Sequence, residues 1–461
     1  MPPQDETDRV ATGGLLGAPG PLRHPGLQRG LDYLAIFALL WFAFFSSMDV
    51  ARANQGLLLL ILLAALRYRY DLRPLIHDRM LQLSVAFLAY LTLRTLWTAL
   101  ESPAFALAAW DEANSWPLTG FFGIVLLGYW LSRIRLRPEW LLAAALAGFG
   151  WRIGSRLAWS DIGAQLSAMA SGTERATFGY SSVNLGIWTS IALLGLMVFW
   201  RRFLIVPTIP VGWLAGAALW LAGIGTTGAV LLFSQSRSAW LTALIVLPLI
   251  ALASLRTGIK SKRGVLSAAL TLLIIGLIAL YQLAQTDLVQ RRIQVQTDAV
   301  VQAMSQASTD AATAGVGLRL AMYRVFWEKW RQRPIFGWGP GKMTQALDES
   351  GVNALSRDRF VHFHSSYFSV LFGFGIVGGA FVAAMFVLLL TQMLHSHRQG
   401  AMPRDLFLFL LGSLLIILLG ALVNEPLQGA NGPYLLSLLG GIAYSYTYRR
   451  AVPTVGADQT S

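Results

Sequence analysis

Two histidines stand directly before a long apolar segment. In the stretch "RFVHFHSSYFSVLFGFGIVGG", His362 and His364 flank one phenylalanine, and the whole chain has only six histidines. A histidine can act as a general base because its unperturbed pKa, about 6.5, lies near neutral pH. Two imidazoles without a nearby carboxylate or cysteine make a weak ligand set for a metal. A structural alternative is that His364 caps the helix that begins at Ser365 or Ser366.

Two polar stretches could bind an anion. The first, "LLFSQSRSAWL", places Arg237 among three serines between two apolar segments, and the second, "SGTERATFGYSSVNLG", supplies Arg175 and Asn184. A planar guanidinium with five donors suits a phosphate, which accepts two parallel hydrogen bonds. Each stretch also has a structural reading, because an arginine at the membrane edge can snorkel and a polar loop can close over a helix N-terminus.

A third stretch, "GLRLAMYRVFWEKWRQRP", predicts a helix over about 317–332 that carries several basic residues. Arg319 and Tyr323 are four residues apart and therefore share one face of this helix, and Arg324 follows Tyr323 directly. The structural alternative is an amphipathic helix that lies on the membrane surface.

Two glycine-rich stretches follow. "GWGPGKM" resembles a nucleotide-binding loop, but Gly337 and Gly341 enclose three residues where the Walker spacing needs four, and Met343 stands where Ser or Thr is required. ATP binding is therefore not expected. The glycines of "GFGIVGG", which include Gly375, most simply permit close helix packing.

The elements that position these residues are apolar helices. Of 461 residues, 55% are hydrophobic and only 13% are charged, whereas soluble proteins carry roughly 25% charged residues. The sequence therefore predicts an all-α integral membrane protein with about 12 transmembrane helices and a long periplasmic helical loop. The expected spans are 32–48, 55–66, 80–99, 118–132, 140–158, 183–200, 211–233, 239–255, 265–283, 365–393, 405–423 and 433–447.

Basic residues indicate the orientation of these spans. Arginine and lysine concentrate in alternate short segments, so the net charge of +13 reflects loop topology and predicts that both termini are cytoplasmic. The expected organisation is a cytoplasmic, disordered tail (1–31), spans 1–9 (32–283), a periplasmic helical loop domain (284–364), spans 10–12 (365–447) and a second cytoplasmic tail (448–461). Because the chain has no cysteine, disulfides, thiolate zinc sites and cysteine nucleophiles are excluded.

Charges within the predicted spans give a further indication. Arg94, Arg152 and Arg156 lie in or near spans three and five, where an unpaired arginine at mid-membrane costs about 2.5 to 3.5 kcal/mol. Such residues usually face a polar cavity, and these three lie toward the same outer side as Arg237 and His364. Several arginines with one histidine and few acids are typical of an anion site.

The order of three motifs resembles the O-antigen ligase family. "SRSAWL" comes first, then an arginine-containing helix that leads into "RPIFGWGPGKM", and then "HSSYFSVLFGFGIVG". The stretch "TERATFGYSSVN" is similar to a family segment that maps its arginine onto Arg175 and its asparagine onto Asn184. The resemblance covers roughly 170–385 in detail. The family usually has His-Asn before the span, whereas Ser365 follows His364 here, so no role is carried over for that asparagine.

This resemblance implies a C-type glycosyltransferase of the bacterial inner membrane with a periplasmic active site. It would transfer a polysaccharide from undecaprenyl pyrophosphate to the lipid A-core of lipopolysaccharide, with inversion and without a metal or other cofactor. His364 would act as the base, and Arg237, Arg319 and Arg175 would bind the pyrophosphate. The secondary candidates are His362, Arg324, Tyr323, Asn184 and Arg156. The expected partners are the two lipid-linked substrates and membrane lipids, with no nucleic acid.

Other functions stay open at this point. A polymerase or a protein O-oligosaccharyltransferase of the same superfamily would use a related donor with a different acceptor. A secondary transporter would also have about twelve spans, but transporters tend to show two similar halves and broken helices at mid-membrane. The sequence shows no convincing repeat, and its polar residues gather at one surface.

Overall fold

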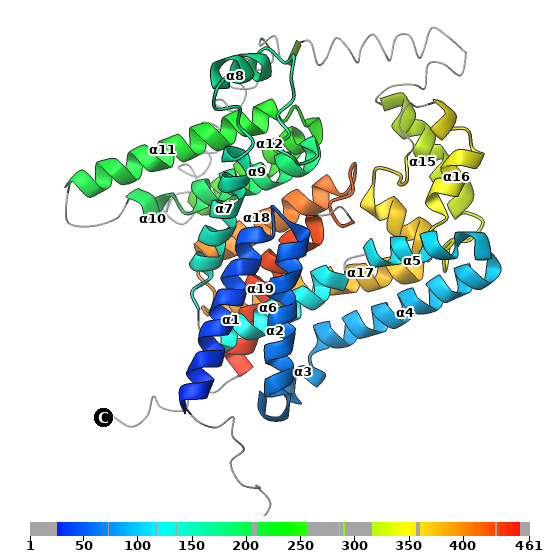
Figure 1. Cartoon of the computed structure of the whole chain (residues 1–461), viewed down its shortest axis with the longest axis horizontal. Helices are drawn as coiled ribbons and strands as arrows, with labels where there is room; N and C mark the ends of the chain where they lie inside the picture. The colour runs from blue at the N-terminus through cyan, green and yellow to red at the C-terminus, as the bar shows by residue number, and fades with distance from the viewer. Residues whose placement is uncertain are drawn as a thin grey trace, which may run out of the picture.

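The computed structural model describes residues 25–71, 73–115, 118–134, 136–204, 210–255, 285, 289–290, 316–355, 360–428 and 431–451. Every regular element in these ranges is a helix, which agrees with the predicted all-α class (Figure 1). The first group of elements is α1 (Pro25–Phe45), α2 (Val50–Asp71), α3 (Arg73–Ile76), α4 (Arg79–Glu101), η2 (Pro103–Phe105), α5 (Ala106–Ser115), α6 (Leu118–Arg133), α7 (Pro138–Gly154), α8 (Ile162–Ala170), α9 (Ser182–Val198), α10 (Trp200–Leu204), α11 (Pro210–Phe233) and α12 (Arg237–Leu255). The second group is α15 (Val316–Trp330), α16 (Met343–Glu349), η4 (Asn353–Leu355), α17 (Ser366–Arg398), α18 (Arg404–Gly420) and α19 (Gly432–Ala451).

Several helices have the length and composition of membrane spans. Five described helices are long and apolar enough to cross a bilayer, namely Gly26–Phe45, Arg79–Glu101, Leu214–Phe233, Arg237–Ser254 and Ser366–Arg398. Three shorter apolar helices accompany them. Each predicted span except 265–283 coincides with a helix, and 265–283 lies outside the described residues. The helices thus indicate a membrane protein, while the count of twelve crossings stays a prediction.

Small residues allow the central helices to approach closely. α19 packs along α6, and a Cβ atom at Gly123 would meet the Ser437 side chain, while one at Gly128 would lie 3.3 Å from the carbonyl oxygen of Gly441. Small residues at helix interfaces bring backbones together where no hydrophobic force acts between helices in lipid. This pair therefore forms a closely packed centre, and α17 and α18 also pack against α19.

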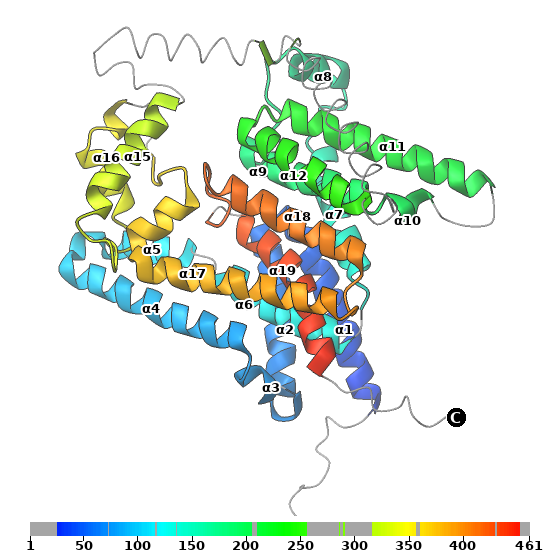
Figure 2. The same cartoon turned by 180° about the vertical axis from the view of Figure 1, so that it is seen from behind.

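A second, smaller core lies at the N-terminal end of α17. Met322 and Phe326 of α15, Leu347 of α16, and Phe363 and Phe372 pack together and are almost fully buried. Figures 1 and 2 both show α15 and α16 beside this end of α17, near α5 and the end of α4. The helix predicted over 317–332 is confirmed by α15. Of the predicted loop domain (284–364), residues 291–315 lie outside the described residues.

The glycine-rich turn after α15 fits into a break in α17. The helix is interrupted at Gly375, whose φ is 63°, and the turn at 334–339 replaces the missing helical hydrogen bonds. Four backbone bonds join the two segments: Trp338 to Phe372 (2.7 Å), Gly339 to Gly373 (2.9 Å), Ile376 to Pro334 (2.9 Å) and Val377 to Ile335 (3.1 Å). A Cβ atom at Gly337 would lie 2.6 Å from the Gly375 nitrogen. These glycines therefore permit a close backbone approach between two segments, and not only helix packing.

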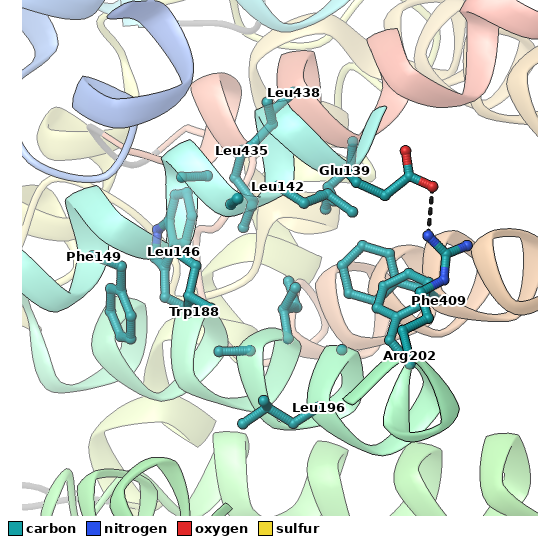
Figure 3. Close-up of a pocket in the computed structure, with 17 residues that line it drawn as sticks. Glu139, Leu142, Leu146, Phe149, Trp188, Leu196, Arg202, Phe409, Leu435 and Leu438 are labelled. Carbon is teal, nitrogen blue, oxygen red and sulfur yellow. Dashed lines mark hydrogen bonds and ion pairs between the residues drawn. The ribbon is translucent and has the colours of Figure 1, made fainter. Parts of the chain in front are cut away.

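An apolar cavity of about 260 Å³ lies between α7, α9, α18 and α19 (Figure 3). Apolar side chains such as Leu142 and Trp188 line it, and the ion pair between Arg202 and Glu139 stands at one end. None of the residues that line this cavity is a candidate from the sequence, so the chemistry must be sought elsewhere.

Candidate functional site

His364 occupies a constrained position immediately before α17. Its φ of 54° is in the left-handed region, which non-glycine residues adopt only where the surroundings impose it. Its backbone N–H donates to Nδ1 of His362 at 3.3 Å, and the two rings are 4.5 Å apart. The N-cap of α17 is Ser365. His364 is therefore not the capping residue, and its imidazole is available for other contacts.

The charge of Arg319 acts on His364. Burial is the main cause that lowers the pKa of His364 to about 4, and the neighbouring His362 and the positive charge of Arg319 lower it further. α15 and the start of α17 thus bring together the predicted base and one predicted anion-binding arginine. The imidazole is neutral at pH 7, which is the form that can accept a proton.

Tyr323 stands one helical turn after Arg319 on the same face of α15. Its ring meets the ring of Phe368 edge-on at 4.9 Å, and its buried hydroxyl has no hydrogen-bond partner among the described residues. Burial raises the pKa of Tyr323, and the charges of Arg319 and Glu425 act on it in opposite directions. Arg319 and Tyr323 share one face of α15, as predicted. This face points toward the start of α17.

Glu425 is the acid that sequence reasoning missed. It lies in the loop between α18 and α19, and its carboxylate accepts hydrogen bonds from the backbone N–H of Ser365 (3.0 Å) and the hydroxyl of Ser369 (2.7 Å). Burial raises the pKa of Glu425 to about 7, although the bonds from the serines oppose this change. The sequence offered one indication of this residue, because Glu425 is the only carboxylate between Asp405 and Asp458. We call His362, His364, Arg319, Tyr323 and Glu425 the His364 cluster.

Arg237 is connected to the same loop. It is the first residue of α12, and its neighbour Ser238 accepts a hydrogen bond from the Asn424 side chain at 2.8 Å. Asn424 precedes Glu425, and its carbonyl oxygen accepts from the Ser366 backbone N–H at 3.0 Å. This loop thus connects the start of α12 to the start of α17. Arg237 is exposed at the start of α12.

Arg175 is held against the turn that precedes Arg237. Its guanidinium donates to the carbonyl oxygen of Gln235 at 3.1 Å. The Gln235 amide in turn donates to the Glu174 carbonyl oxygen at 2.9 Å, and Gln235 has a left-handed φ of 48°. The two polar stretches from the sequence therefore meet, with Arg175 and Arg237 on adjoining turns.

The remaining candidates are not part of the His364 cluster. Arg324 is on the exposed side of α15, and Arg156 is exposed on the turn after α7. Asn184 is in the first turn of α9 and lines a small cavity beside Pro426. The guanidinium of Arg94 donates to the Gly337 carbonyl oxygen at 3.1 Å, so this arginine supports the glycine-rich turn.

Arg152 also holds backbone. It donates to the carbonyl oxygens of Ser47 (3.2 Å) and Phe178 (3.3 Å) and lies over the ring of Tyr180 at 4.0 Å. Arg94 and Arg152 therefore donate hydrogen bonds to backbone carbonyl groups. The sequence predicted both arginines at a polar anion-binding cavity, whereas the structure gives them this structural role. Within the described ranges, no three histidine or acidic side chains come together as metal ligands would.

The comparison with known families agrees with the order of the motifs. Residues 222–383 match the family model described as O-antigen ligase, and this segment contains Arg237, Arg319, His364 and the break in α17. No curated protein matches the chain. The chain is thus similar to the O-antigen ligase family over residues 222–383.

Proposed function

We propose that this protein is an O-antigen ligase that transfers a polysaccharide from undecaprenyl pyrophosphate to lipid A-core at the periplasmic side of the inner membrane. The observation that carries the proposal is the proximity of Arg319 to the neutral imidazole of His364 within the segment that matches the family. The apolar helices are consistent with lipid-linked substrates, whose lipid portions would remain in the bilayer.

In the proposed reaction, His364 acts as the base. The acceptor hydroxyl transfers its proton to the neutral imidazole while its oxygen forms a bond to the anomeric carbon of the donor sugar. The bond between that carbon and the pyrophosphate oxygen breaks, and its electron pair leaves with undecaprenyl pyrophosphate. Attack on the face opposite to the leaving group inverts the anomeric centre. The imidazolium then releases its proton to water.

The arginines would stabilise the charge that develops on the leaving group. Positioned guanidinium groups bind pyrophosphate oxygens through charge-assisted hydrogen bonds and act most strongly where water is excluded. Arg319 and Arg237 are the principal proposed ligands, and Arg175 is the third. A bound pyrophosphate would also offset the charge of Arg319 and raise the pKa of His364, so donor binding itself would strengthen the base.

Glu425 acts in this proposal as a positioning residue. Its carboxylate holds the peptide that follows His364 and the hydroxyl of Ser369 in the first turn of α17. The loop that contains it also contacts Ser238 through Asn424. This loop would therefore fix the distance between the base and the helix that begins at Arg237.

A transfer assay tests the proposal. Purified protein in lipid nanodiscs is given a glycan on undecaprenyl pyrophosphate, lipid A-core and EDTA, and His364→Ala is compared with the unchanged protein. We expect lipid A-core to acquire the glycan with the unchanged protein alone. Glycan joined to a second lipid-pyrophosphate unit, with lipid A-core unmodified, would instead establish a polymerase. Uptake of a substrate without any glycan transfer would establish a transporter.

A further inference from the structure

A polar cavity of about 220 Å³ lies apart from the His364 cluster. It is bounded by the end of α4, the end of α15, the glycine-rich turn and α16. Lys329 lines it, and this residue is ten positions after Arg319 on α15, which corresponds to about 15 Å along the helix axis. Both sites are therefore built on α15 but lie near its opposite ends.

Two of the three cations in the cavity are paired with acids. Arg333 donates to both carboxylate oxygens of Glu101, at 2.8 and 3.1 Å. Lys329 donates to Glu349 at 2.9 Å. The ring of Trp338 lies under the guanidinium of Arg333, at 4.5 Å, and the ammonium of Lys329, at 5.7 Å. Cation–π contacts of this kind hold the two cations in place before any ligand arrives.

Lys342 is the third cation and lacks such a partner. The residue is only 9% exposed, and its ammonium lies over the ring of Phe105 at 4.2 Å. Among the described residues, no carboxylate forms a salt bridge with it. Burial is the main cause that lowers the pKa of Lys342, and the charge of Arg333 lowers it further, whereas the charges of Glu101 and Glu349 oppose this change. The net decrease is expected for a cation whose hydration is incompletely replaced. An anion bound in the cavity would replace that hydration.

We propose that this cavity binds an anionic sugar, a single ring that carries a carboxylate or a phosphate, with the anion on Lys342. The proposal rests on the proposed function, which supplies polysaccharide substrates on this side of the protein. The volume is below the roughly 300–1,000 Å³ of sites for larger ligands, which favours one ring. Glu349 and Gln345 line the cavity and provide groups that can exchange hydrogen bonds with sugar hydroxyls.

The first experiment measures binding directly. Saturation-transfer NMR on the protein in nanodiscs compares methyl glucuronide with the neutral methyl glucoside, and Lys342→Met removes the charge while keeping a chain that packs on Phe105. We expect the glucuronide to bind at least about tenfold more tightly than the glucoside, and Lys342→Met to remove this preference. Arg331→Met is the matched control, because Arg331 is exposed, contacts Trp327 and does not line the cavity.

The second experiment identifies the source of the sugar. In the transfer assay, Lys342→Met should raise the KM of one lipid-linked substrate by about tenfold with little change in kcat. A raised donor KM assigns the anionic sugar to the polymer, and a raised acceptor KM assigns it to the core. Glucuronide binding that depends on Lys342, in a protein without transferase activity, would support the cavity and contradict the proposed function. Two results together would overturn the cavity assignment: the unchanged protein shows no preference for the glucuronide, and Lys342→Met transfers glycan normally. The proposed ligase function would then still stand.

Discussion

The carboxylate of Glu425 accepts a hydrogen bond from the backbone N–H of Ser365 at 3.0 Å, directly after His364. The same oxygen accepts from the hydroxyl of Ser369 at 2.7 Å. Two segments that are 60 residues apart in sequence are thereby joined at the position of the proposed base. A left-handed residue such as His364 is maintained only by contacts of this kind.

Replacement of Glu425 should therefore misplace His364. Glu425→Ala leaves the Ser365 N–H and the Ser369 hydroxyl without their acceptor, and the loss of buried hydrogen bonds predicts about a 10- to 100-fold decrease in kcat. Glu425→Gln keeps an amide oxygen that can accept both bonds and should retain most activity. Glu328→Ala, at an exposed acid of α15, serves as the control. Equal loss in the Gln and Ala variants would contradict a positioning role and indicate that the carboxylate itself reacts.

Removal of the base should abolish turnover without unfolding the protein. General-base catalysis contributes about 10²- to 10⁴-fold, so His364→Ala should lower kcat by at least about two orders of magnitude in the transfer assay. Donor binding should remain within a few-fold of normal, as measured with a fluorescent lipid-pyrophosphate analogue. His395→Ala, near the other end of α17, is the control. Wild-type kcat in His364→Ala would rule out this assignment.

Lysine should not replace the arginines that bind pyrophosphate. A lysine keeps the charge but lacks the planar pair of donors, so Arg319→Lys and Arg237→Lys should each lower kcat/KM by about 10- to 100-fold. Arg324→Lys is a matched control on the exposed side of the same helix as Arg319. Full activity in both test variants would indicate a requirement for positive charge alone.

Hydropathy predicted the helices well, because a run of apolar residues reports directly on burial in lipid or in a bundle. Eleven of the expected spans, among them 80–99 and 365–393, coincide with helices of the structure. Helical spacing also predicted correctly that Arg319 and Tyr323 share a face. These features depend on neighbours within one element, and a single sequence therefore contains them.

Features that depend on contacts between distant segments could not be predicted in this way. The bonds from the 334–339 turn to the broken α17 and the bond from Ser365 to Glu425 arise only when the chain is folded. For the same reason, Arg152 was expected at an anion site, although it bonds to backbone carbonyl groups of two other segments. Burial within a span does not reveal which partner a charge will find.

The break in α17 should be sensitive to one added methyl group. Gly375 has a positive φ, and a Cβ atom there would collide with the carbonyl oxygen of Ile335. Gly375→Ala should therefore destabilise the protein by more than about 1 kcal/mol and lower its Tm in nanodiscs. Gly379→Ala, four residues later on the same helix, would meet only the end of the Leu371 side chain at 3.2 Å and should have a smaller effect. An unchanged Tm in Gly375→Ala would contradict the close packing of the turn.

The pH dependence of transfer should report the surroundings of His364. A base works in its neutral form, so activity is lost as the pH falls through its pKa. Because the pKa of His364 is lowered to about 4, the acidic limb of kcat/KM, which reports the free enzyme, should lie far below the limb of an ordinary histidine near 6.5. The limb of kcat should lie at higher pH, since a bound pyrophosphate offsets the charge of Arg319.

Glu425 provides the competing outcome for this measurement, because its pKa is raised to about 7. If its carboxylate were the base, kcat/KM would fall as the pH decreases through about 7, and Glu425→Gln would remove both this limb and most of the activity. If His364 is the base, Glu425→Gln keeps the limb near 4, and Arg319→Met shifts it to higher pH because a nearby positive charge has been removed. The position of the acidic limb in these two variants therefore shows whether His364 or Glu425 accepts the proton.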